Sequence, residues 1–186
     1  MKQDDYQILQ VALDFAAKTH AADLKKKTSV PYIFHPLAVA SYVLQFGGDF
    51  NQAAAGAIHD TISEGREVYF LDLFGKDVTE LAFSFLDPEG TADLPWESLK
   101  SHYLAKIRQV DVRALLVIAC EELHDCRSLN LEVRMHGQEI WERYPVDPSQ
   151  VMWYYQELLK IFRSKLQGNP LVEEFAQAVA DLRSLE

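Results

Sequence analysis

A histidine and an aspartate stand side by side at His59 and Asp60, in the segment "GAIHDTISEG" of residues 56–65. They follow the apolar, alanine-rich run of residues 53–58, which has the composition of a closely packed helix. An imidazole and a carboxylate at one helix end can reach the same divalent ion through different donor atoms. The pair therefore indicates a metal site, with an exposed polar helix end as the simpler alternative.

Two further groups could complete such a site. His35 directly precedes Pro36, which fits the first turn of a helix, so this histidine could bind a metal or simply cap and pack the helix. Glu121 lies in the apolar run "VRALLVIACEELHDCRSL" and shares a helix face with His124 and Asp125, which follow at i+3 and i+4. Charged groups in so apolar a helix must be paired, metal-bound or turned to solvent, because burial of an unpaired charge is expensive.

The combined donor set contains two imidazoles and two carboxylates, from His35, His59, Asp60 and Glu121. Such a set suits a borderline to hard divalent ion such as Mn²⁺, and it leaves coordination positions for water and a phosphate oxygen. The residue types are therefore those of a metal site that could act on a phosphorylated compound.

Helical periodicity runs through almost the whole chain, and no segment is a convincing strand. Asp4 or Asp5 is placed to cap the first helix, and Asp49 to cap the helix that delivers His59 and Asp60. The expected helices cover residues 8–19, 36–46 and 50–60, then 68–74 and 78–86, a helix from 96, a central helix from 112, and the segments 149–166 and 169–186. We expect an all-α protein, a helical bundle that forms one domain over residues 1–186.

Composition restricts the setting of the protein. The 186 residues are 48% hydrophobic, enough for one sizeable core, and no apolar run approaches the roughly 18 residues of a membrane span. The polar, acidic N-terminus argues against a secretion signal, and the only cysteines, Cys120 and Cys126, are too few for a disulfide framework. The net charge of −10 argues against a nucleic-acid polymer as partner, although small phosphorylated ligands are compatible with it. We expect a soluble, cytoplasmic protein without a membrane partner.

Several segments together resemble one known family. In order they are "FAAKTH", a basic loop, "PYIFHPLAVA", "AAAGAIHDTISEG", "LFGKDV", "LPWESLKSHYLAKI", "ALLVIACEELHDCRSL" and "VMWYYQELL". This order resembles the HD-domain hydrolases of the RelA/SpoT type, above all the stand-alone small alarmone hydrolases, over nearly the whole chain. The resemblance implies an all-α bundle and the manganese-dependent removal of the 3′-pyrophosphate from (p)ppGpp or a related purine nucleotide.

The resemblance assigns four metal ligands by position. His35 matches the histidine of the family's "HP" motif, and His59 with Asp60 matches its "HD" pair. Glu121 stands where the family has its last metal-binding aspartate, and the longer side chain keeps the charge and the oxygen donor. His20 matches a histidine common in the family, but it could equally cap or brace the first helix.

The catalytic positions depart from the family pattern. Its "HDxxED" signature ends in two acidic residues that hold or activate the attacking water, and the corresponding residues here are Ser63 and Glu64. Glu64 would then orient the water or take its proton, with Ser63 in the place of the second carboxylate. The segment from His59 to Phe74 is also shorter than is usual in the family, which indicates a trimmed loop over the site.

The substrate-binding positions depart as well. Lys25 and Lys26 occupy the family's basic loop, where lysine attracts phosphate but lacks the bidentate and stacking contacts of arginine. Asp125 replaces an asparagine that usually contacts the nucleotide, which adds repulsion near an anionic ligand. Tyr154 or Tyr155 could stack on a base, although aromatic residues of an amphipathic helix more often belong to the core.

Two functions are open at this point. The first is a metal-dependent nucleotide phosphohydrolase of the alarmone-hydrolase type, whose substrate preference could differ from that of the family. The second is a catalytically degenerate HD-fold protein that binds a nucleotide or a protein partner. The four retained ligands favour the first, whereas Ser63 and the negative charges of Glu122 and Asp125 favour the second. Assembly into a homo-oligomer also stays open.

Overall fold

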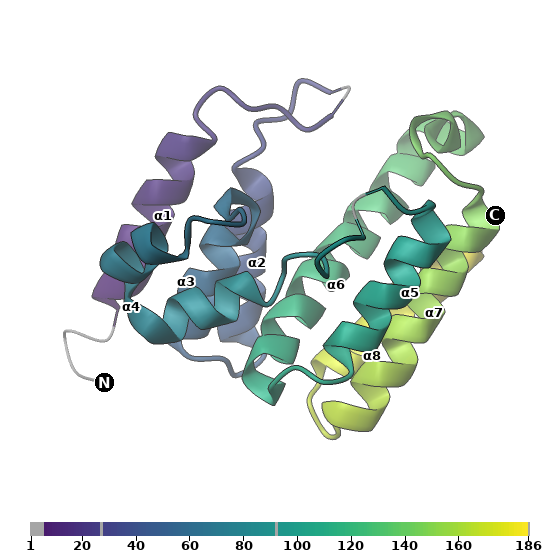
Figure 1. Ribbon diagram of the computed structural model, residues 1–186. Helices are drawn as coiled ribbons and strands as arrows, with labels where there is room; N and C mark the ends of the chain where they lie inside the picture. The colour runs from purple at the N-terminus through teal and green to yellow at the C-terminus, as the bar shows by residue number, and fades with distance from the viewer. Residues whose placement is uncertain (1–5, 27, 92, 186) are drawn as a thin grey trace. The chain divides into compact units, whose positions relative to one another are not determined.

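The computed structural model describes residues 6–26, 28–91 and 93–185, and every side chain among them except that of Arg143. Helices dominate the chain (Figure 1). They are α1 (Gln7–Thr19), α2 (Phe34–Gln45), α3 (Phe50–Ile58), the 3-10 helix η1 (His59–Thr61), α4 (Glu67–Phe83), α5 (Trp96–Ile107), α6 (Val112–His136), the 3-10 helix η2 (Gly137–Arg143), α7 (Pro148–Lys165) and α8 (Leu171–Arg183). Within the described ranges the only extended pairing is an isolated bridge between Leu24 and Pro31, and no helix there is long and apolar enough to cross a membrane. The all-α prediction is confirmed.

The chain divides into two compact units. The first unit contains Met1–Leu86 with Arg113–Glu121, and the second unit contains Asp87–Val112 with Glu122–Glu186. Helix α6 therefore supplies its N-terminal part to the first unit and its remainder to the second. The prediction of a single domain over residues 1–186 stays a prediction.

The start of α3 follows the capping signal in the sequence. The Asp49 carboxylate accepts a hydrogen bond from the Gln52 backbone N–H at 2.9 Å, and the Gln52 side-chain oxygen accepts one from the Asp49 N–H at 3.0 Å. This reciprocal capping box satisfies two N–H groups that would otherwise have no partner at the helix start. The predicted cap of α1 at Asp4 or Asp5 lies outside the described residues.

Helix α4 contains the break that the sequence predicts between two shorter helices. At Gly75 the backbone leaves helical geometry, with φ of 74° and ψ of 174°, and the helix resumes beyond it. A positive φ is strained for residues that carry a Cβ atom, so glycine is the residue suited to this bend. The segments 68–74 and 78–86 expected from the sequence correspond to the two halves.

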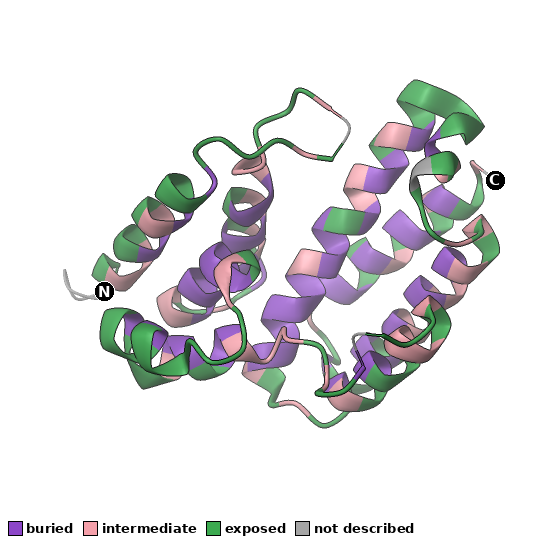
Figure 2. Ribbon diagram, turned by 45° about the horizontal axis from the view of Figure 1, so that its top comes forward, coloured by how far each residue is buried: buried purple, intermediate pink, exposed green. Residues whose placement is uncertain are grey.

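Small side chains let α3 lie against α1, α2 and α4 in the first unit. Residues 52–58 of α3 are all buried, and four of them are alanines (Figure 2). At Gly56 a Cβ atom would lie 3.0 Å from Val39 Cγ1 on α2 and 3.3 Å from Val117 Cγ1 on α6. Because the core is already filled at this point, the absence of a side chain permits the close approach of three helices.

An ion-pair cluster at the start of α6 ties three helices of the first unit together. The Arg113 guanidinium lies 2.7 Å from Asp77 Oδ1 on α4 and 2.8 Å from Asp49 Oδ2 at the start of α3. The Gln52 side chain also donates to the Arg113 carbonyl at 2.8 Å. Paired N–H groups of an arginine fix orientation as well as charge. These contacts therefore anchor the stretch of α6 that carries Glu121.

Aromatic rings fill the core of the second unit, where α7 packs on α5 and α8. The centroid of the Phe175 ring lies 5.0 Å from that of Phe162 and 6.1 Å from that of Tyr155, and both pairs meet edge to face. These separations lie within the favourable range for aromatic pairs. The second unit therefore has a hydrophobic core of its own.

We expect Gly56→Val to lower the free energy of unfolding by about 1–3 kcal/mol, because extra atoms in a filled core force side chains and backbone to shift. Ala17→Val, on the exposed side of α1, is the matched control and should cost at most about 0.7 kcal/mol, the difference in helix propensity. Urea unfolding followed by circular dichroism measures both variants. Equal stabilities would contradict the packing assigned to Gly56.

Candidate metal centre

His59 takes its orientation from the last turn of α3. The chain tightens there into η1, and the His59 side chain is buried. Its Nδ1 lies 2.7 Å from the carbonyl oxygen of Gly56. Because a carbonyl oxygen only accepts hydrogen bonds, Nδ1 carries the proton, and Nε2 of the neutral ring keeps a lone pair that can bind a metal.

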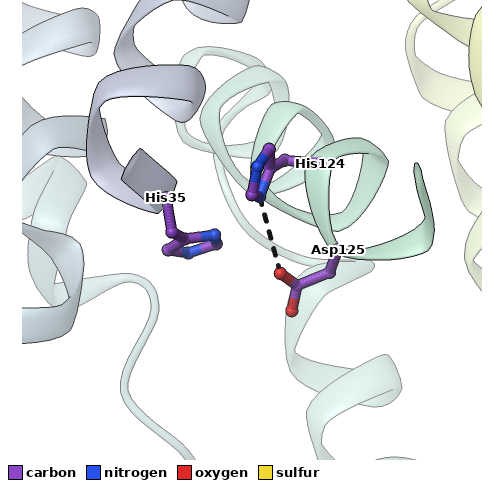
Figure 3. Close-up of side chains that lie close together, drawn as sticks. All are labelled: His35, His124 and Asp125. Atoms are coloured by element: carbon purple, nitrogen blue, oxygen red, sulfur yellow. Dashed lines mark ion pairs between the residues drawn. The ribbon is translucent and has the colours of Figure 1, made fainter. Parts of the chain in front are cut away.

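His35 presents a second ring nitrogen from the first turn of α2 (Figure 3). Its Nε2 lies 3.1 Å from His59 Nε2, and the two residues are only 5% and 6% exposed. Two imidazole nitrogens at this separation are compatible only with a shared proton or a bound cation, because two bare lone pairs repel each other. The first unit thus brings two nitrogen donors to one point.

Asp60 adds a carboxylate to the two imidazoles. Its Oδ1 lies 3.0 Å from His59 Nε2 and its Oδ2 lies 3.5 Å from His35 Nε2, while the side chain is 24% exposed. Burial acts to raise the pKa of Asp60, but when the imidazoles are protonated the hydrogen bond and charge of His59, the charge of His35 and a hydrogen bond from Tyr32 outweigh it and lower this pKa from 3.8 to about 2. The carboxylate is therefore ionised at neutral pH.

Glu121 completes the donor set from α6. One of its carboxylate oxygens forms a group with a ring nitrogen of His35 and one of His59, in which all three atoms lie within 4.8 Å of one another. The residue is half-buried. Together with Asp60, these residues make up the four ligands expected from the sequence, and all four belong to the first unit. Two neutral imidazoles and two carboxylates fit a divalent cation in donor type and in charge.

Ser63 and Glu64, the expected catalytic positions, lie in the loop between η1 and α4, where both are exposed. The Ser63 carbonyl accepts a hydrogen bond from the Arg66 N–H at 3.3 Å, and Gly65, with φ of 78°, makes the turn. Within the described part of the chain, Glu64 has neither a hydrogen bond nor an ion pair. Its carboxylate is accessible, and the catalytic roles of both residues stay predictions.

An open pocket of about 610 Å³ lies beside Asp60. It is lined by His20, Ala22, Asp23, Leu24, Tyr32 and Asp60. Its wall is the loop between α1 and α2, which two backbone hydrogen bonds of 2.8 Å fold back, one from the Lys25 N–H to the Val30 carbonyl and one from the Tyr32 N–H to the Asp23 carbonyl. The volume lies within the usual range for small-molecule sites.

Neither of the two lysines expected to bind phosphate is among the described residues that line this pocket. Lys25 Nζ lies 5.7 Å from the centroid of the Phe34 ring, and Lys26 is exposed. The pocket instead carries the carboxylates of Asp23 and Asp60. The phosphate-binding role of Lys25 and Lys26 stays a prediction.

His20 braces the wall of the pocket from the end of α1. Its Nδ1 lies 2.9 Å from Asp23 Oδ2, and its ring packs on that of Tyr32 with the centroids 5.0 Å apart. The side chain is 7% exposed. Both contacts are with the loop that follows α1, and the roles that the sequence leaves open for His20 stay predictions.

The contact between Tyr32 and Asp60 was not predicted from the sequence. The Tyr32 hydroxyl donates a hydrogen bond to Asp60 Oδ2 at 2.8 Å. The motif "PYIFHP" drew attention only through His35 and Pro36, yet the tyrosine stands three residues before the histidine, at the same helix start. A hydroxyl-bearing ring one turn away from a metal-ligand candidate is the signal that could have identified it.

Asp125 lies on α6 in the second unit, with a side chain that is 49% exposed and an Oδ1 atom 3.8 Å from His124 Nδ1 (Figure 3). Tyr154 and Tyr155, on α7, are only 4% and 6% exposed. Their rings pack on each other with the centroids 5.9 Å apart. Both tyrosines therefore belong to the core of the second unit, and their stacking on a base stays a prediction.

Glu122 is also buried, which changes the interpretation of its charge. The Tyr154 hydroxyl donates a hydrogen bond to it, and the charge of Lys100 acts on it as well. Burial nevertheless raises the pKa of Glu122 above its ordinary value. The carboxyl of Glu122 thus lies inside the second unit, where burial favours its protonated form over the ionised one.

Comparison with known proteins identifies the family. The profile of the HD domain matches residues 12–143. The Synechocystis protein named "Probable guanosine-3′,5′-bis(diphosphate) 3′-pyrophosphohydrolase" is 31% identical over 127 residues, which cover 64% of this chain and 16% of that protein. The guanosine-3′,5′-bis(diphosphate) 3′-pyrophosphohydrolase of Aquifex aeolicus is 29% identical over 129 residues, 65% of this chain and 18% of that protein. The chain thus spans less than a fifth of the length of these curated relatives.

Two solved structures share the fold. The structure of a metazoan orthologue of SpoT, a protein that hydrolyses ppGpp, matches with a TM-score of 0.72 at 18% sequence identity, over 96% of this chain and 97% of that chain. A crystal structure of a Listeria monocytogenes EGD-e protein matches with a TM-score of 0.69 at 23% identity, over 78% of this chain and 96% of that chain. The fold expected from the resemblance is confirmed. Because the HD profile covers most of the sequence, the chain belongs to the HD-domain family.

Proposed function

We propose that this chain is a metal-dependent nucleotide phosphohydrolase that releases the 3′-pyrophosphate of (p)ppGpp or a related purine nucleotide, with Mn²⁺ as the metal. The observation that carries the proposal is the convergence of donor atoms from His35, His59, Asp60 and Glu121. The names of the relatives from Synechocystis and Aquifex, both 3′-pyrophosphohydrolases of guanosine-3′,5′-bis(diphosphate), support the substrate class.

The four residues divide the task of holding the metal. A divalent ion bound here would polarise a phosphoryl oxygen and lower the pKa of a water that attacks phosphorus. His35 and His59 would contribute neutral Nε2 atoms, and the tautomer of His59 is already set by the Gly56 carbonyl. Asp60 and Glu121 would contribute the negative charge that offsets the cation.

Glu64 is the residue that we propose as the proton acceptor for the attacking water. It follows Asp60 by four positions and exposes a carboxylate that has no partner among the described residues. A positioned carboxylate within hydrogen-bond reach of a water can take its proton in the transition state. Ser63, next to it, would hydrogen-bond the same water in place of the family's second carboxylate.

The pocket beside Asp60 suits the uncharged part of a nucleotide. Asp23 and Asp60 in its lining can accept hydrogen bonds from ribose hydroxyl or base amino groups, whereas they would repel a phosphate. Lys25 and Lys26 lie on the same loop outside that lining and would attract the phosphates. We propose the nucleoside in the pocket and the 3′-pyrophosphate at the metal.

A catalytically degenerate protein that binds the same nucleotide is the second candidate. Ser63 favours it, because one acidic residue of the family's catalytic pair is missing at that position. Both candidates use the same metal ligands, so turnover is the property that separates them.

We expect the protein with Mn²⁺ to release pyrophosphate from ppGpp, pppGpp or ppApp but not from ordinary mono- or triphosphates. His59→Ala should lower kcat/KM by about 100-fold or more, because several kcal/mol of charge stabilisation depend on the metal. His102→Ala, an exposed histidine on α5, is the matched control and should leave kcat/KM unchanged. Pyrophosphate release measured over this panel decides between the two candidates. Absence of turnover by folded, metal-loaded protein would favour the degenerate binding protein.

Glu64→Gln should lower kcat by about 100-fold to 10,000-fold while leaving the Kd for Mn²⁺ unchanged, because the amide cannot accept the proton. Glu67→Gln, an exposed carboxylate at the start of α4, is the control that removes a nearby charge without the proposed role. Steady-state kinetics and calorimetric metal titration measure the two quantities separately. An unchanged kcat would rule out Glu64 as the base, and a weaker Kd would show that it is a ligand instead.

On the role that the family resemblance gives Asp125, Asp125→Asn should lower KM about fivefold, since removal of a like charge about 4 Å from an anionic group in water relieves about 1 kcal/mol. The gain should shrink as salt is added, because Asp125 is half exposed and its field is screened. Asp72→Asn, on the exposed side of α4, controls for the change in net charge. If KM stays the same at low salt, Asp125 does not face the nucleotide.

A further inference from the structure

Tyr32 has a backbone that is fixed from both sides. Its N–H donates to the Asp23 carbonyl at 2.8 Å, and its carbonyl accepts from the His35 N–H at 3.0 Å. The first bond closes the loop between α1 and α2, and the second belongs to the turn that leads into α2. The Tyr32 side chain therefore starts from a well-defined position at the entrance of the helix that carries His35.

The Tyr32 ring is held between two histidines. Its centroid lies 5.0 Å from that of His20 and 5.7 Å from that of His35, with both rings tilted against it. His20 is in turn fixed by the contact of its Nδ1 with Asp23 at 2.9 Å. Because the neighbours of the ring are themselves fixed, the direction of the Tyr32 hydroxyl is defined by packing rather than by a single torsion.

The hydroxyl reaches the one oxygen of Asp60 that lies farther from His59. It donates to Oδ2 at 2.8 Å, while Oδ1 faces His59 Nε2 at 3.0 Å. In the described part of the chain, Asp60 contacts His35, His59 and Tyr32, and of these only Tyr32 is not a proposed metal ligand. When a cation engages the histidine nitrogens, the tyrosine remains as the group that can still orient the carboxylate.

We propose that Tyr32 is a positioning residue of the metal centre, which holds the Asp60 carboxylate through Oδ2 so that Oδ1 is directed toward Nε2 of His59. The inference rests on the metal centre of the proposed function. Asp60 belongs to a three-residue 3-10 helix, and its side chain is 24% exposed, so its two side-chain torsions need an external restraint. Partners that orient a ligating carboxylate typically contribute about 10-fold to 100-fold to metal affinity.

The test is the Kd for Mn²⁺, measured by calorimetric titration of the full chain without nucleotide. Tyr32→Phe removes only the hydroxyl and keeps the ring between His20 and His35, and we expect it to weaken the Kd about 10-fold to 100-fold. Tyr69→Phe, whose ring is 45% exposed on α4, is the matched control and should change the Kd by less than about twofold. Equal affinities for Tyr32→Phe and the unsubstituted protein overturn the proposal.

A double-mutant cycle separates positioning from a general effect on folding. If Tyr32 acts through Asp60, Tyr32→Phe should change the Kd by less than about twofold once Asp60→Ala has removed the carboxylate. Additive losses would overturn the proposal, because the hydroxyl would then act by another route. If Asp60→Ala abolishes measurable binding, the comparison of Tyr32→Phe with Tyr69→Phe decides. A general loss of stability leaves the Kd of the folded protein unchanged, so it cannot imitate the expected result.

The same titration distinguishes this inference from the proposed activity. If Mn²⁺ binding is tight and depends on Tyr32 but no nucleotide is turned over, the hydrolase proposal is contradicted and the positioning role is supported. Absence of Mn²⁺ binding by the unsubstituted protein would overturn the positioning role directly.

Discussion

The proposed metal centre depends on the hydrogen bond from His59 Nδ1 to the Gly56 carbonyl, which the fold of the first unit provides. This bond sets the tautomer of the histidine and lies in the last turn of a helix that is buried from residue 52 to residue 58. Gly56 has no side chain because Val39 of α2 and Val117 of α6 occupy the space. These two helices also carry His35 and Glu121. The close packing of three helices therefore sets the separations among the donor atoms.

The negative charge of the donor set also suits a cation. Asp60 is ionised at neutral pH because hydrogen bonds and the nearby imidazoles outweigh the cost of its burial. Tyr32 holds one of its oxygens and, with Asp60, also lines the open pocket. In the proposed function, the metal centre and the pocket share these two side chains, so a bound nucleoside would lie directly beside the metal. A site organised in this way loses little free energy to rearrangement when a ligand binds.

Much of the fold could be predicted because caps, bends and apolar periodicity depend on residues that are close in the sequence. The capping residue Asp49 and the bend at Gly75 act within a few residues, so their effect can be derived from the sequence. The four ligand candidates came from residue types and from the order of family motifs. Tyr32 was missed because its partner Asp60 is 28 positions away and no periodicity connects them. The contact of Glu122 with Tyr154 and the influence of Lys100 on it were missed for the same reason, since both partners lie on other helices.

The central claim is that His35, His59, Asp60 and Glu121 hold one divalent ion. Diffraction from Mn²⁺-soaked crystals on the two sides of the manganese absorption edge tests it most directly, because the anomalous signal locates the ion without reference to activity. We expect one strong peak within coordination distance of Nε2 of both histidines and of an oxygen from each carboxylate. No peak at this position in metal-loaded crystals, or a peak bound by other residues, would contradict the claim.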